Sequence, residues 1–155
     1  MEAQQIIDKL EMIPHPEGGY YAETYRSKST VHGDEIMSII YFLLEPGQVS
    51  YWHQIKQDEM WFHHCGAPLE VHCISTEGKP FVLQLGQIGH EENLPQQLVP
   101  AHTIFGSKMT GNEGYSLVSC VVAPAFKFED FKLFKREELV ELFPNLEREI
   151  DQLSL

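Results

Sequence analysis

The chain has 155 residues, 43% of them hydrophobic, which fits one compact domain with a core. Its 23 acidic and 11 basic residues give a net charge of −12, which argues against a surface that binds nucleic acid or anionic lipid. Three cysteines are an odd number without metal-type pairing, so we expect free thiols in a reducing compartment. We therefore predict a single domain over residues 1–155.

The first residues predict a short helix. Ala3–Met12 places its apolar residues on one side, and Pro14 and Pro16 prevent its continuation. This start lacks the basic residues and the apolar stretch of a secretory signal, so a cytoplasmic location is expected. The most apolar run, Ile36–Leu44, is much shorter than the roughly 20 residues that span a bilayer. We expect no membrane-spanning helix.

From Gly18 onward, short runs rich in β-branched and aromatic residues alternate with turn clusters. The predicted strands are Tyr20–Arg26, Ile36–Leu44, Val49–His53, Glu59–His64, Leu69–Ser75, Phe81–Gln87, Gln97–Val99, Thr103–Phe105 and Tyr115–Val122. So many short strands predict an all-β sandwich or barrel over about residues 18–134. Helices are then expected over about residues 135–153, in Glu137–Phe143 and Leu146–Leu153, packed against the barrel's exterior.

One stretch has a spacing with chemical meaning. Five residues lie between Gly47 and His53, and one lies between His53 and Ile55. Three residues then lie between Ile55 and Glu59, and six between Glu59 and Gly66. Side chains alternate between the faces of a strand, so His53 and Ile55 are expected to point the same way. A histidine and a glutamate near one another in a barrel interior form a candidate acid–base pair.

The same alternation places Trp61 and His63 on the face of Glu59. We expect this face to look into the barrel, with Trp61 and Phe105 as an aromatic wall. Arg26 and Glu23 are each expected to be solvated strand residues, with the alternative that one of them reaches the pocket mouth, depending on which face of the first strand is buried.

This spacing resembles the first motif of the cupin superfamily, whose fold is a double-stranded β-helix of jelly-roll type. In particular, the chain resembles a cupin group that opens with a His-Pro-Glu-Gly-Gly segment. The matching pieces are His15-Pro16-Glu17-Gly18-Gly19, Tyr20 to Ser27, Ser50-Tyr51-Trp52-His53, Asp58-Glu59-Met60-Trp61, and Pro124-Ala125-Phe126 ahead of Asp130-Phe131. The resemblance covers about residues 15–143. It implies a cupin jelly-roll barrel with short flanking N- and C-terminal helices, and a homodimer.

Departures from the cupin pattern bear on the chemistry. The resemblance implies a metal held by two histidines, a glutamate and a later histidine. Ile55 stands in place of the second histidine, and Phe105 in place of the last. His102 occupies the position of a turn glycine, and we interpret it as a partly exposed turn histidine. Only His53 and Glu59 remain of the four ligands.

Three functional hypotheses stay open, and the sequence leaves undecided whether the protein is an enzyme. The preferred one is a cupin that binds a small polar ligand, sugar-like or nucleotide-like, without a cofactor. His53 then acts as general base or acid and Glu59 orients it, as implied by sugar-nucleotide epimerases on similar jelly rolls that use a histidine without metal. The expected pocket-lining residues are Tyr41, Ile55, Trp61, His63 and Phe105.

The second hypothesis is a metal-dependent, oxygenase-like cupin that binds a divalent metal through His53, Glu59 and His63. The third is a non-catalytic sensor or interaction module. In its purely structural form, His53 and Glu59 share a buried hydrogen bond that holds the barrel together.

Overall fold

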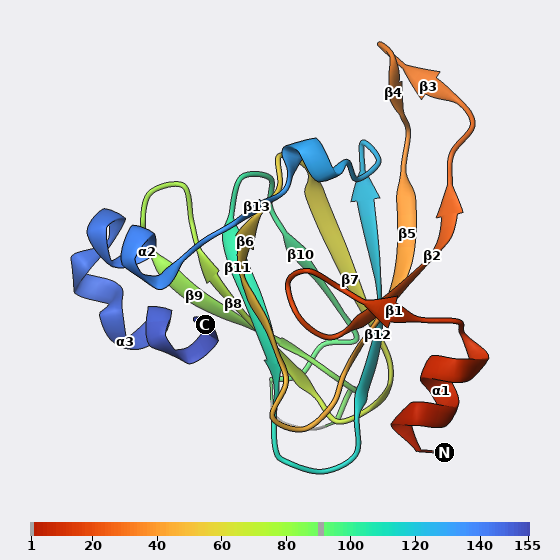
Figure 1. Ribbon diagram of the computed structural model, residues 1–155, viewed down its shortest axis with the longest axis horizontal. Coiled ribbons are helices and arrows are strands. Elements are labelled where there is room, and N and C mark those ends of the chain that lie inside the picture. Colours follow the sequence, from red (N-terminus) through yellow and green to blue (C-terminus); the bar gives the residue numbers. More distant parts are fainter. Residues whose placement is uncertain (1, 90–91) are drawn as a thin grey trace.

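Two antiparallel sheets face each other and enclose the apolar interior of the protein (Figure 1). The computed structural model describes residues 2–89 and 92–155. The six-stranded sheet consists, in spatial order, of β1 (Ile13–Pro14), β2 (Tyr20–Arg26), β5 (Ser38–Leu44), β12 (Ser116–Ala123), β7 (Asp58–Gly66) and β10 (Gln96–Val99). The five-stranded sheet consists of β13 (Lys132–Leu133), β6 (Val49–Gln54), β11 (Ile104–Met109), β8 (Leu69–Ile74) and β9 (Pro80–Leu85).

The remaining elements lie outside this sandwich. A small hairpin projects from one end of β2 and β5, formed by β3 (Thr30–Val31) and β4 (Asp34–Glu35) around a turn at Gly33 (Figure 1). The helical elements are α1 (Ala3–Lys9), η1 (Phe128–Asp130), α2 (Arg136–Leu142), η2 (Pro144–Leu146), α3 (Glu147–Ile150) and η3 (Asp151–Leu153). In the described part of the chain, no helix is long and apolar enough to cross a bilayer.

The core forms because alternate side chains of both sheets point inward. Phe42 and Trp61 of the six-stranded sheet meet Val71 and Phe105 of the five-stranded sheet in one apolar cluster. All four side chains are almost completely buried. This packing fills one part of the barrel and leaves the end near the hairpin open.

Helices cover parts of the two outer faces. Trp52 points away from the interior, and its indole N–H donates to the carbonyl oxygen of Ile150 at 2.8 Å. This contact fixes the C-terminal helices against the five-stranded sheet. Along α1, Ile6 and Ile7 pack near Leu43 in a separate cluster on the six-stranded sheet.

The predicted fold class is confirmed, and all nine predicted strands are present. The prediction for Thr103–Phe105 was too short, because β11 continues to Met109. Its polar residue Ser107 is fully buried between β6 and β8, so a pattern based on apolar residues missed it. The two-residue strands were also missed, since they are too short to show alternation.

Candidate functional site

A cavity of about 520 Å³ lies at the barrel end next to the hairpin and η1. Side chains of β2, β5, β6, β7 and β12 form its walls, and the segment after β12 lies over its mouth. The volume falls in the range of about 300–1,000 Å³ typical of small-molecule sites. Four groups of residues give this cavity its chemistry: a polar pair inside it, a second carboxyl group, a second imidazole and a charged rim.

The polar pair consists of His53 on β6 and Glu17 in the loop before β2. His53 Nε2 lies 3.1 Å from Glu17 Oε2, and His53 Nδ1 lies 2.7 Å from the carbonyl oxygen of Tyr51. A carbonyl oxygen only accepts, so Nδ1 carries the proton and Nε2 of the neutral ring is the acceptor. Glu17 Oε2 is then protonated and donates to His53.

The protonation of this pair agrees with its burial. Burial lowers the pKa of His53 to about 3, which keeps the ring neutral. Burial, followed by the charge of Glu59, raises the pKa of Glu17 well above its ordinary value, although a hydrogen bond from Ser50 opposes the shift. The Ser50 hydroxyl donates to Glu17 Oε1 at 3.1 Å, so both carboxyl oxygens have fixed roles.

Gly18 allows the loop that carries Glu17 to approach β6 closely. Gly18 has a φ of 101°, and a Cβ at this position would lie 2.1 Å from the carbonyl oxygen of Val49. A residue with a side chain cannot approach β6 this closely. The close approach also lets the Tyr51 N–H donate to the Glu17 carbonyl oxygen at 2.6 Å. The loop is thereby held against β6 beside His53.

The second carboxyl group belongs to Glu59 on β7, in the opposite sheet. Glu59 is only 7% exposed, and it lines the cavity. Burial raises its pKa to about 7, and a hydrogen bond from the Cys120 thiol lowers it less than burial raises it. A carboxyl group with a pKa near neutrality can both take up and release a proton at physiological pH.

His15 adds a second imidazole to the wall. The Glu17 backbone N–H donates to His15 Nδ1 at 3.2 Å, so the proton of the neutral ring is on Nε2. Burial lowers the pKa of His15 to about 4. The cavity thus presents neutral imidazoles and carboxyl groups whose pKa values lie above their ordinary range.

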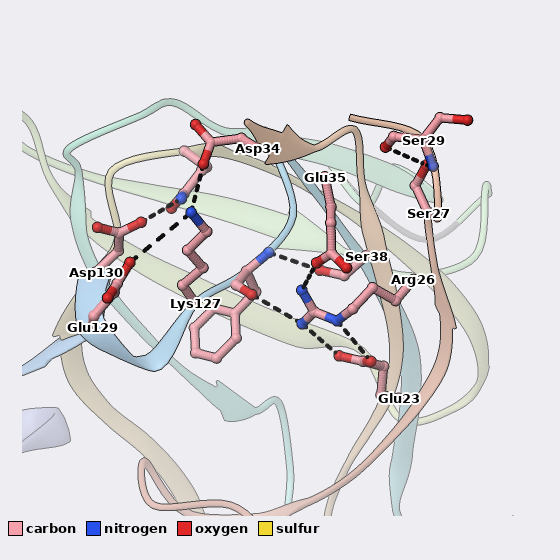
Figure 2. A network of polar contacts seen from close by, with 12 residues as sticks. Glu23, Arg26, Ser27, Ser29, Asp34, Glu35, Ser38, Lys127, Glu129 and Asp130 are labelled. Atoms are coloured by element: carbon pink, nitrogen blue, oxygen red, sulfur yellow. Dashed lines mark hydrogen bonds and ion pairs between the residues drawn. The ribbon is translucent and has the colours of Figure 1, made fainter. Parts of the chain in front are cut away.

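Ion pairs tie the rim together (Figure 2). The Arg26 guanidinium contacts Glu23 at 2.8 Å and Glu35 at 2.6 Å, and it donates to the Phe126 carbonyl oxygen at 2.9 Å. Lys127 pairs with Asp34 at 2.5 Å. These contacts link the hairpin side of the rim to the segment after β12, which covers the mouth.

Replacing Arg26 with lysine is expected to loosen this covering segment, because an ammonium group cannot reproduce the guanidinium's fork of donors. The amides of Ala125 and Phe126 donate to Glu35 and Ser38, and their hydrogen exchange should become several-fold faster. Hydrogen-exchange mass spectrometry measures this. Arg136→Lys is the matched control, since Arg136 also bridges two carboxylates but lies outside the cavity lining. Unchanged exchange in Arg26→Lys would contradict this role.

The structure places part of the predicted site in the cavity. His53, Glu59 and Ile55 line it, and Arg26 and Glu23 both reach its mouth. The predicted orientation of His53 by Glu59 is wrong, because both ring nitrogens of His53 already have other partners. The predicted purely structural His53–Glu59 hydrogen bond is absent for the same reason.

The other predicted pocket residues lie elsewhere. Tyr41 is on the outer face of β5, with its ring 5.7 Å from that of His64, because Ile40 and Phe42 occupy the inward positions. Trp61 and Phe105 do point inward, but they are packed into the core. His63 lies two residues beyond Trp61, and its Nε2 contacts the Ala67 carbonyl oxygen at 3.2 Å. His102 is exposed in a turn, as predicted.

Comparison with known proteins identifies the family. Residues 4–134 match the family model described as cupin superfamily (DUF985). The chain belongs to this cupin family. A crystal structure of a Shewanella oneidensis protein is 41% identical, with a TM-score of 0.95 over 100% of this chain and 98% of that one. A hypothetical protein from Leishmania major is 35% identical, with a TM-score of 0.94 over 99% of both chains.

An uncharacterised Saccharomyces cerevisiae protein is 27% identical in an alignment of length 154 that covers 87% of this cupin and 76% of the yeast protein. These likenesses establish the family and the fold, and they assign no reaction. The chemistry of this cupin has to be argued from its own cavity.

The cavity does not fit the metal site that the cupin resemblance implies. Ile55 and Phe105 offer no donor atoms, and His63 does not line the cavity. Both nitrogens of His53 are engaged by Glu17 and the Tyr51 carbonyl. Within residues 2–89 and 92–155, no group of three or more His, Cys, Asp or Glu side chains is arranged to hold a metal ion. The predicted alternative set of His53, Glu59 and His63 is therefore not brought together.

Sequence reasoning missed Glu17 as a site residue, because it used His15 to Gly19 only as a matching segment of the cupin resemblance. The signal was the pair Gly18-Gly19, which permits left-handed backbone and close approach to another strand. The sequence reasoning also assigned no role to the phenylalanines after β12. Phe126, Phe128 and Phe131 all line the cavity.

Proposed function

We propose that the cavity of this cupin binds a small polar ligand of about the size of a sugar and exchanges protons with it without a metal. The reaction class is that of an epimerase or isomerase. The observation that carries the proposal is the neutral Glu17–His53 pair, which lies in the same cavity as a second protonatable carboxyl group, Glu59.

The Glu17–His53 pair supports the base function. In its ionised form, the Glu17 carboxylate can accept a proton from a ligand carbon next to a carbonyl group. The newly protonated Glu17 then donates to Nε2 of His53, so Glu17 is the group that touches the ligand and His53 stabilises its protonated form. This reverses the roles expected from the sequence, in which His53 acted directly.

Glu59 supports the acid function. It comes from β7 in the six-stranded sheet, whereas His53 comes from β6 in the five-stranded sheet, so the two groups approach a ligand from different walls. A pKa of about 7 makes Glu59 able to return a proton at neutral pH. Epimerisation needs this arrangement, because one face of the carbon loses the proton and the other face gains it.

Solvent-deuterium incorporation tests the proposal. Protein dialysed against EDTA is incubated in D₂O with a panel of aldoses, ketoses and amino sugars, and deuterium in each compound is measured by NMR and mass spectrometry. We expect incorporation at a carbon next to the carbonyl of at least one compound, unchanged by the chelator. Incorporation that is lost with EDTA and restored by a divalent metal would contradict the metal-free mechanism, and no incorporation would contradict the catalytic proposal.

Two further expectations from the sequence stay predictions. The homodimer is checked by light scattering of the purified protein, and the cytoplasmic location by cell fractionation.

A further inference from the structure

Several aromatic rings line the cavity around His15. The His15 ring packs edge-on against Tyr21 at 4.5 Å and against Phe131 at 5.9 Å. Phe126 and Phe128 meet at 4.9 Å. Phe128 lines the cavity but is 54% exposed, so it is not a core residue. We call Tyr21, Phe126, Phe128 and Phe131 the aromatic rim.

Behind the aromatic rim, the cavity contains acidic groups without a cation. Glu17 and Glu59 are each 7% exposed and line the same cavity. Among the described residues, no cationic side chain pairs with Glu59, and the Cys120 thiol beside it is only a weak donor. Two buried carboxyl groups in one cavity favour a positively charged neighbour.

The positive side chains at the mouth are already neutralised. Arg26 is held by Glu23 and Glu35, and Lys127 lies within 4 Å of Asp34 and Glu129 (Figure 2). In this part of the described chain, four carboxylates therefore surround two cations. An anionic ligand would have to break these pairs, whereas a cationic ligand meets an excess of negative charge.

We propose that the ligand of this cavity carries a protonated amine. This inference rests on the ligand-binding half of the proposed function. The ammonium group lies between the carboxyl groups of Glu17 and Glu59 and the faces of the aromatic rim. Such faces attract cations through the electrostatic field of the aromatic ring. The net charge of −12 also attracts cations from solution at long range.

Three aromatic probes of similar size and different charge test this inference: benzylamine, benzyl alcohol and benzoate. At neutral pH the first is a cation, the second is neutral and the third is an anion. Isothermal titration calorimetry on the full chain measures their dissociation constants. We expect benzylamine to bind at least about tenfold more tightly than benzyl alcohol, and benzoate to bind most weakly.

Variants locate the binding. Phe128→Ala truncates an exposed ring, and Glu59→Gln removes a charge while keeping the size of the side chain. Each should reduce the preference for benzylamine over benzyl alcohol to less than about threefold. Tyr25→Ala is the matched control, because Tyr25 is 50% exposed and does not line the cavity. It should leave the preference unchanged.

The outcomes separate this inference from the proposed function. No binding of benzylamine, equal or tighter binding of benzyl alcohol or benzoate, or an equal loss of preference in Tyr25→Ala would overturn the inference. Deuterium incorporation into an uncharged sugar would still support the proposed reaction in that case. Selective amine binding without any deuterium incorporation would support the amine site and overturn the reaction.

Discussion

Glu17→Gln is expected to slow deuterium incorporation into the responsive compound by about 10²–10⁴-fold, the range that a general acid or base contributes. Glutamine preserves the local geometry: its amide N–H can donate to His53 Nε2, and its oxygen can accept from Ser50, as the Glu17 carboxyl does. It cannot release a proton. A large loss of rate in a folded variant would therefore report proton transfer rather than positioning.

Glu70→Gln is the matched control for this experiment. Glu70 forms a similar pair with His72 at 2.9 Å, but neither residue lines the cavity. Its rate should stay within about twofold of wild type. Thermal melting of each variant verifies the fold. A folded Glu17→Gln protein with an undiminished rate would show that Glu17 does not transfer the proton.

The free energy of unfolding of Glu59→Gln is expected to increase relative to that of the wild type as the pH rises. The pKa of Glu59 is about 7 in the folded protein and 4.5 as a model value, so the folded state holds a proton that the unfolded chain loses first. The stability that Glu59 contributes is complete below pH 4.5 and is lost as the pH rises through about 7. The difference corresponds to about 3 kcal/mol.

Urea unfolding between about pH 4 and pH 8 measures this effect as the difference between variant and wild type. The wild-type curve alone is insufficient, because His15 and His53 have lowered pKa values and act in the opposite direction. Their contribution is present above pH 6.5 and is lost as the pH falls towards 4 and 3. Glu77→Gln, on an exposed turn, is the control. A constant difference between Glu59→Gln and wild type would contradict the raised pKa.

The sequence determined the fold because the relevant signals are local. Turn residues between short β-branched and aromatic runs located the strands, and the spacing from Gly47 to Gly66 located His53 and Glu59. Alternation could not decide which face of β5 is buried. Ile39, Ile40, Tyr41 and Phe42 are all apolar or aromatic, so the pattern fits either face, and Tyr41 was assigned to the wrong one.

Only the tertiary structure decided how the cavity is completed. Glu17 reaches His53 from a loop before the first long strand, and Phe126 to Phe131 close the mouth from beyond the last one. Neither contact follows from periodicity, because each depends on how the ends of the chain pack against the barrel. The cupin motif thus predicted that His53 lies on a strand and points into the barrel. It did not predict the partner of His53, Glu17, which belongs to a separate loop that the backbone at Gly18 holds against β6.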